Sequence, residues 1–87
     1  MNKKKSNHIT FARLESVLKE LGFVKKVVPG TGVGYKHPPT GALVVVRLHK
    51  PREIVPDYVI VGVRHELEWQ GVIEAKEFEE MLQAAAA

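Results

Sequence analysis

The chain has 87 residues, a length that suits one domain built around one hydrophobic core. Hydrophobic residues make up 45% of it and charged residues 26%, so the composition argues against intrinsic disorder. Cysteine is absent, which excludes disulfides, thiolate metal sites and cysteine nucleophiles. No apolar run approaches the roughly 20 residues that cross a bilayer. We therefore expect a cytoplasmic protein that binds no membrane and needs no metal or cofactor.

The net charge of +3 is unevenly distributed along the chain. Residues 1–64 hold 12 lysines and arginines against 4 acids, a net of +8, whereas residues 65–87 hold 1 against 6, a net of −5. The basic part favours a surface for a polyanion such as RNA. The acidic part would repel phosphate, so we expect it to lie away from that surface or to face a basic partner.

The first predicted element is a helix that follows a mobile basic arm. Residues 1–8 are polar and lysine-rich without periodicity, and we expect a single folded domain over residues 9–87. Thr10 is a plausible N-cap, and Gly22 supplies a C-terminal stop. Between them, apolar residues recur at helical spacing at Phe11, Leu14, Leu18 and Leu21.

Three strands are predicted next, over residues 23–28, 33–37 and 42–48, separated by glycine- and proline-rich turns. The third strand divides into two faces by the period of two. One face is wholly apolar and is expected to pack against helices; it holds Ala42, Val44, Val46 and Leu48. The other face is apolar at one end and basic at the other; it holds Leu43, Val45 and Arg47 and continues to His49.

Residues 56–69 combine strand-forming side chains with a helix signal. Tyr58 and the valines and isoleucine after it favour a strand, but Pro56 and Asp57 form a good helix opening and the apolar residues recur at helical spacing up to Leu67. We predict a helix that stops at Gly71, and a last helix over residues 74–82. The fold class is then α+β: a three-stranded antiparallel sheet packed against helices, in the order α-β-β-β-α-α. Double-stranded-RNA-binding domains use this arrangement without the last helix.

Several basic side chains are candidates for binding RNA phosphates through charge. They are Lys25, Lys26, Lys36, Arg47, His49, Lys50 and Arg52. The alternative interpretation is that they are ordinary solvated surface residues. Gly32 and its neighbouring glycines could admit an RNA backbone or could simply build a hairpin, and we expect Tyr35 and Trp69 to pack against the protein rather than to stack on bases.

A resemblance to a known family appears at residues 30–38, Gly-Thr-Gly-Val-Gly-Tyr-Lys-His-Pro. This segment resembles the HicA family of small toxins from toxin-antitoxin pairs, which typically runs glycine, serine, histidine, one or two variable residues, an aromatic residue, a basic residue and then His-Pro. Further short matches cover most of the chain: Leu21-Gly22-Phe23, Val46-Arg47-Leu48-His49, Pro56, Gly71 and Glu77-Phe78-Glu79-Glu80-Met81-Leu82.

The resemblance implies a double-stranded-RNA-binding-like fold, metal-independent cleavage of mRNA by an endoribonuclease, and neutralisation by a HicB-type antitoxin. The family's catalytic histidine would fall at Gly32, and glycine has no side chain to act as a general acid or base. RNA binding without full ribonuclease activity is therefore expected. His37 and His49 are weak candidates to take over the chemistry, because imidazole titrates near neutral pH; a structural turn role is the alternative for His37.

Two functions remain open. The first is an RNA-binding HicA-like toxin component with lost or weak ribonuclease activity. The second is a protein-interaction module that binds a HicB-like antitoxin or another partner without RNA activity. A homodimer is compatible with either, because so small a core leaves a thin margin of stability.

Overall fold

The computed structural model describes residues 8–30 and 32–84. Along the chain, the elements are α1 (Phe11–Glu20), β1 (Val24–Val27), β2 (Gly32–His37), β3 (Ala42–Arg47), α2 (Asp57–Trp69) and α3 (Ala75–Ala84). The α+β class and the predicted element order are confirmed, and the ambiguous segment after Pro56 is a helix. Apart from His8, the basic arm expected at residues 1–8 lies outside the described residues.

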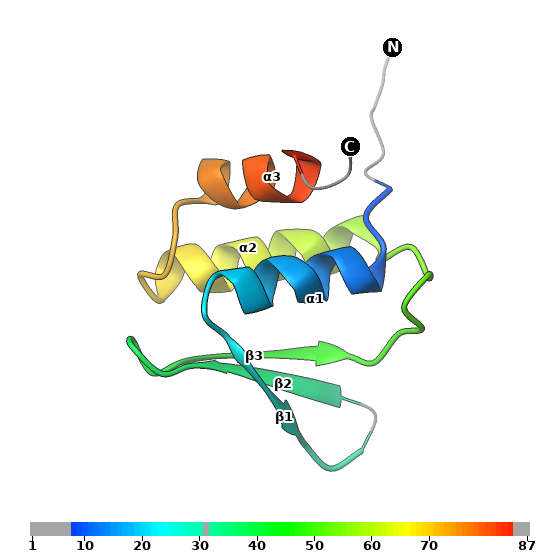
Figure 1. The fold of residues 1–87 in the computed structure, drawn as a ribbon, viewed down its shortest axis with the longest axis horizontal. Helices are drawn as coiled ribbons and strands as arrows, with labels where there is room; N and C mark the ends of the chain where they lie inside the picture. The colour runs from blue at the N-terminus through cyan, green and yellow to red at the C-terminus, as the bar shows by residue number, and fades with distance from the viewer. Residues whose placement is uncertain (1–7, 31, 85–87) are drawn as a thin grey trace.

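The three strands form an antiparallel meander in the order β1-β2-β3. Figure 1 shows α1 and α2 side by side over one face of this sheet, with α3 on the far side of that helix pair. No described helix covers the opposite face of the sheet, which we call the outer face. β1 and β3 are the two edge strands of the sheet, and α2 packs beside β3.

The hydrophobic core lies between the inner face of the sheet and the helices. Tyr35 of β2 and Phe78 of α3 are its largest fully buried side chains. The rest of the core alternates along the strands and recurs at helical spacing, as the sequence pattern predicts; it includes Leu14, Leu18, Val33, Val44, Val46, Ile60, Val63, Leu67 and Leu82. None of the described helices is long and apolar enough to span a membrane.

Local chemistry explains where the helices start and stop. The Thr10 hydroxyl accepts a hydrogen bond from the Arg13 N–H (3.1 Å), which caps the start of α1. Gly22 and Gly71 both have positive φ and follow the ends of α1 and α2. The loop between β3 and α2 is tied to the start of α1, because the Phe11 N–H donates to the Glu53 carbonyl (2.9 Å).

Two expectations about apolar side chains are wrong. The pattern of the third strand places Leu48 on its buried face, but β3 ends at Arg47 and Leu48 is exposed, because strand alternation stops with the strand. Trp69, which we expect from its size to pack, is 77% exposed. It lies two residues beyond the buried Leu67, and two residues turn a helix by more than half a revolution, so its side chain points away from the core.

Candidate nucleic-acid interface

Three cations share the outer face of the sheet, one from each strand. Lys26 of β1 pairs with Gly34 of β2. Arg47 of β3 pairs with Gly32, which lies two residues before Gly34 on β2. Lys36 follows Gly34 by two residues and therefore points the same way. All three cationic side chains are exposed. Strand spacing of about 4.8 Å and a same-face repeat of about 6.8 Å place their Cα atoms roughly 8–14 Å apart, a span that several consecutive phosphates can cover.

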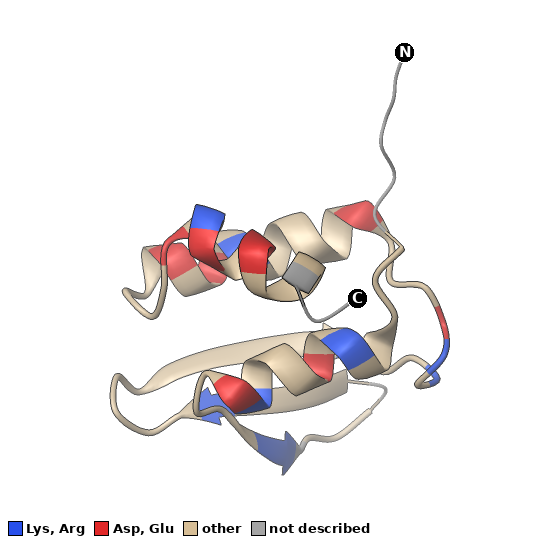
Figure 2. Cartoon of the chain, turned by 45° about the horizontal axis from the view of Figure 1, so that its top comes forward, with Lys and Arg blue, Asp and Glu red and all other residues tan. Residues whose placement is uncertain are grey.

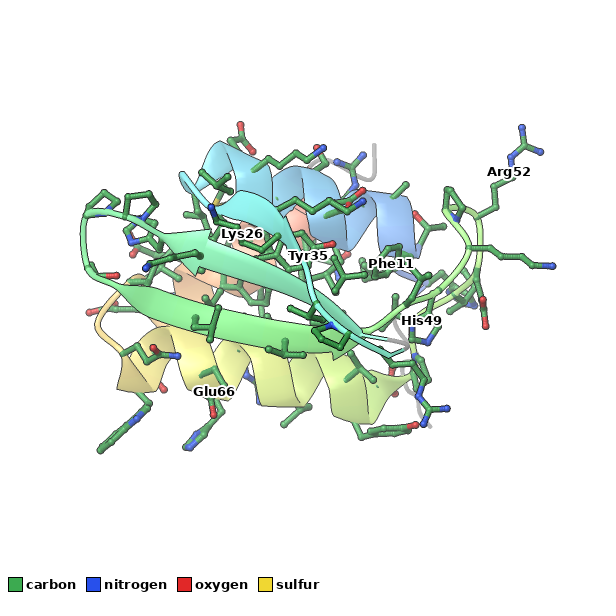
Figure 3. The ribbon with its side chains drawn as sticks, turned by 90° about the horizontal axis from the view of Figure 1, so that it is seen from below. Phe11, Lys26, Tyr35, His49, Arg52 and Glu66 are labelled. Carbon is green, nitrogen blue, oxygen red and sulfur yellow. The ribbon has the colours of Figure 1, made fainter. Side chains whose placement is uncertain are left out.

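Lys25, also predicted to bind RNA, lies on the other side of the sheet. It pairs with the buried Tyr35 in the sheet register, and its Nζ atom lies 2.9 Å from Oε2 of Glu15 on α1. The Tyr35 hydroxyl donates a hydrogen bond to the same Glu15 oxygen (2.8 Å). The charge of Lys25 is therefore paired within the domain, whereas the side chain of Lys26 lies on the outer face. Lys26 and Tyr35 are labelled in Figure 3, which views the sheet from below.

This network of Glu15, Lys25 and Tyr35 changes the acidity of two of its members. Burial raises the pKa of Tyr35 above its ordinary value of 10, and the hydrogen bond to the Glu15 carboxylate and its negative charge add to the effect. Burial also opposes ionisation of Glu15, but hydrogen bonds from Lys25 and Tyr35 and the charges of Lys25 and Lys19 outweigh it, so the pKa of Glu15 is lowered. At neutral pH, both pKa shifts favour a charged Glu15 carboxylate and a neutral Tyr35 hydroxyl.

The raised pKa of Tyr35 predicts a loss of stability in alkali. The unfolded chain releases the phenolic proton near pH 10 while the folded protein retains it, so above that pH the free energy of unfolding falls by up to about 1.4 kcal/mol per pH unit. Below pH 10 this contribution is fully present. Urea unfolding of wild type and Tyr35→Phe between pH 8 and about pH 11 should give a shallower alkaline decline for the variant. Parallel declines would contradict the assignment.

The two outward-facing glycines of β2, Gly32 and Gly34, differ in how closely other side chains pack over them. An added Cβ atom at Gly34 would lie 3.1 Å from Cγ1 of Val28 and 3.7 Å from the Lys26 carbonyl oxygen. Val28 thus fills the space that a side chain at Gly34 would need, and this supports the hairpin interpretation of that glycine. At Gly32 the nearest atoms are Cγ1 of Val45 (3.3 Å) and Cγ2 of Val28 (3.4 Å), so a side chain there would require these valines to shift by a few tenths of an ångström. Position 32 is therefore less crowded than position 34, where the closest contact is 3.1 Å.

His37 is held in the core at the far end of β2. It is 8% exposed, and its ring lies against Phe23 with the centroids 4.9 Å apart. Its Nε2 donates to the Leu21 carbonyl (3.1 Å), and its Nδ1 lies 2.7 Å from the Thr40 hydroxyl oxygen. Both ring nitrogens are thus used to tie the turn after β2 to the end of α1. This arrangement supports the structural role and separates His37 from the cations around Gly32.

His49 lies just beyond β3, close to Arg47. Its Nδ1 donates to the Arg47 carbonyl (2.8 Å), and its ring lies near that of Phe11, with the centroids 5.6 Å apart. In the neutral imidazole, a proton on Nδ1 leaves a lone pair on Nε2, so His49 retains a basic nitrogen. The structure therefore places this histidine at the edge of β3, against Phe11 of α1, and not on the outer face where the strand alternation predicted it.

The remaining two candidates lie on the loop between β3 and α2. Lys50 and Arg52 are exposed, and the Lys50 N–H donates to the Glu53 carboxylate (3.1 Å). Figure 3 shows the Arg52 side chain extending away from the sheet. The structure therefore groups Lys26, Lys36 and Arg47, places His49 at the adjoining edge of β3, and leaves Lys25, Lys50 and Arg52 outside that group.

Comparisons with known proteins add nothing to this geometry. No family model, curated protein or solved structure matches the chain. Within the described residues, no three histidine or acidic side chains come together as a metal site. The interpretation of the site therefore depends on its own side chains.

A groove that the sequence pattern did not reveal runs between β3 and α2. It has a volume of about 690 Å³ and is lined by residues 43–47 of β3 and by residues of α2 that include Tyr58 and Glu66. Gln70, just after α2, holds one end of β3: its amide nitrogen donates to the Leu43 carbonyl, and its amide oxygen accepts from the Leu43 N–H, both at 3.1 Å. No local sequence signal marks Gln70, because its partner lies 27 residues away.

Proposed function

We propose that the domain is an RNA-binding protein of the HicA-like toxin type, with ribonuclease activity that is weak or lost. The observation that carries the proposal is the group of Lys26, Lys36 and Arg47 on one open face of a three-stranded sheet. Cations that release counterions from a phosphate backbone supply most of the sequence-independent affinity for nucleic acid.

The position of the acidic residues supports the same proposal. Figure 2 shows Lys and Arg positions on the strands and a concentration of Asp and Glu on α2 and α3. Arg64 of α2 forms an ion pair with Glu79 of α3, so part of the acidic charge is neutralised within the helical layer. Because the helices lie on the inner side of the sheet, their carboxylates are kept away from the outer face.

The expected weakness of catalysis follows from Gly32. This residue lies directly opposite Arg47 on the outer face, which is where a histidine would meet bound RNA. Glycine supplies no proton-transfer group, and such a group normally contributes a factor of about 10²–10⁴ in rate. His49 near Arg47 is the side chain best placed to sustain residual cleavage.

Filter binding of an RNA oligonucleotide at low and moderate salt tests the proposal. Replacing Lys26, Lys36 and Arg47 by glutamine should lower the affinity at least tenfold. It should also reduce the salt dependence, by about 0.7 in the logarithmic slope for each phosphate of a single strand that the variant no longer neutralises. Lys25→Gln is the matched control, because it removes one charge from the neighbouring position on the opposite face. The proposal fails if the triple variant and Lys25→Gln retain RNA equally well.

A further inference from the structure

The edge of β3 exposes backbone groups that no strand satisfies. In an antiparallel ladder, alternate residues point both the N–H and the C=O away from the neighbouring strand. Leu43 does so, because both of its groups bond to Gln70, and Val45 and Arg47 must then do the same. His49 takes the Arg47 carbonyl. Neither group of Val45, nor the Arg47 N–H, has a partner within residues 8–30 and 32–84.

The groove beside this edge is open over part of α2. Gly62 of α2 lines it, and nothing lies within 4 Å of where a Cβ atom at Gly62 would be. Tyr58, one turn earlier and 78% exposed, forms the adjoining wall. A partner backbone lying along β3 would therefore have the free groups of Val45 on one side and a vacant, partly apolar pocket over α2 beneath its side chains.

We propose that this groove binds an extended segment of another protein, which pairs with β3 as a fourth strand. The segment would exchange hydrogen bonds with Val45, place an apolar side chain over Gly62 and set an acidic residue beside Arg47 and His49. Strand addition of this kind draws affinity from main-chain hydrogen bonds and selectivity from pockets for alternate side chains. The proposal is independent of RNA binding by the outer face.

The geometry favours a single strand over a second copy of this chain. Figure 3 shows α2 projecting past the free edge of β3, and Figure 1 shows it in the helical layer. A two-fold pairing of β3 with β3 would place the two α2 helices in the same space under the joined edges.

The charges in the groove favour a peptide over RNA. Arg47 and His49 lie at one end and Glu66 toward the other, where its carboxylate accepts a hydrogen bond from Gln70 (3.0 Å). A carboxylate in the groove repels a phosphate backbone, whereas a peptide backbone carries no net charge and matches the repeat of the strand edge. The opposed charges at the two ends also select the orientation of a segment that is acidic at one end.

Selection from a phage-displayed library of random peptides on the full-length protein tests the proposal. Synthetic versions of the enriched peptides are then titrated against wild type, Val45→Pro, Gly62→Leu and Val61→Leu. Val45→Pro removes an outward N–H from an edge strand, a position where proline is tolerated. Gly62→Leu fills the pocket from the helix side, and Val61→Leu adds bulk to the neighbouring position outside the groove lining.

Both Val45→Pro and Gly62→Leu should bind the peptides at least about tenfold more weakly than wild type. This is the loss expected for one backbone hydrogen bond or for a comparable loss of packing. The control variant Val61→Leu should bind the peptides as wild type does. Gly62→Leu should melt at or above the wild-type temperature, because leucine favours a helix more than glycine does, so unfolding cannot account for its loss of binding. The proposal is overturned if no peptide is enriched, or if enriched peptides bind Gly62→Leu as they bind wild type. It is also overturned if sedimentation shows a dimer that Gly62→Leu dissociates, or if Gly62→Leu weakens the binding of an RNA oligonucleotide, which would place RNA in the groove.

Discussion

Replacing Gly32 by histidine should accelerate RNA cleavage about 10²–10⁴-fold over the wild-type protein, which is the range that a positioned general acid or base contributes. Position 32 lies in an extended strand and faces outward opposite Arg47. Among the described residues, the atoms within 3.5 Å of a Cβ atom there are Cγ1 of Val45 and Cγ2 of Val28. Small shifts of these two valines would place an imidazole beside the cation proposed to bind phosphate, and cleavage should then depend on pH near neutrality.

Gly32→Asn is the matched control, because asparagine adds a polar side chain of similar shape without a titratable group. Cleavage of a labelled RNA oligonucleotide is followed for the three proteins, with binding measured in parallel. Equal rates for Gly32→His and Gly32→Asn, with RNA binding intact, would show that position 32 is not the catalytic position implied by the HicA resemblance. Cleavage by wild type at a rate that Gly32→His does not exceed would show that another residue performs the chemistry.

Truncating Phe78 to alanine should destabilise the protein by about 3–5 kcal/mol, the usual cost of removing a buried phenylalanine. The helix α3 lies on the far side of α1 and α2 from the sheet. Phe78 is nevertheless fully buried, because its side chain belongs to the core between α3 and these two helices. A small domain has only about 5–15 kcal/mol of stability, so this variant should be partly or wholly unfolded at room temperature.

Trp69→Ala is the control for Phe78→Ala, since it removes a larger aromatic side chain from an exposed position. Its effect should stay within about 0.5 kcal/mol. Unfolding is best followed by far-ultraviolet circular dichroism, because the single tryptophan is already exposed in the folded state and its fluorescence will change little. A comparable loss of stability in both variants would mean that Trp69 packs in solution and that α3 contributes less than the structure indicates.

The two surfaces described for this domain meet at Arg47. Its side chain points to the outer face opposite Gly32, and its backbone belongs to the free edge of β3. A strand bound at that edge and an RNA bound on the face would therefore both approach this arginine. The peptides selected on the groove provide a direct way to measure whether the two ligands compete.

Local sequence signals determined the element order and the helix limits of this protein. The Thr10 cap, the glycines at 22 and 71 and the apolar spacing after Pro56 each act within a few residues, so they can be read along the chain. The same holds for the alternation of Val44 and Val45 across the two faces of β3. These features depend on backbone geometry and on the period of each element, and neither requires knowledge of distant partners.

Interactions between distant residues decided which charges and edges are available to a ligand. Lys25 and Lys26 are adjacent and identical in type, yet Glu15 neutralises one and the strand register presents the other outward. Gln70 caps Leu43 and leaves Val45 open, and His49 turns back to the Arg47 carbonyl instead of continuing the strand. Electrostatic pairing and the satisfaction of backbone groups depend on which atoms the fold brings within a few ångströms, and sequence separation carries no information about that distance.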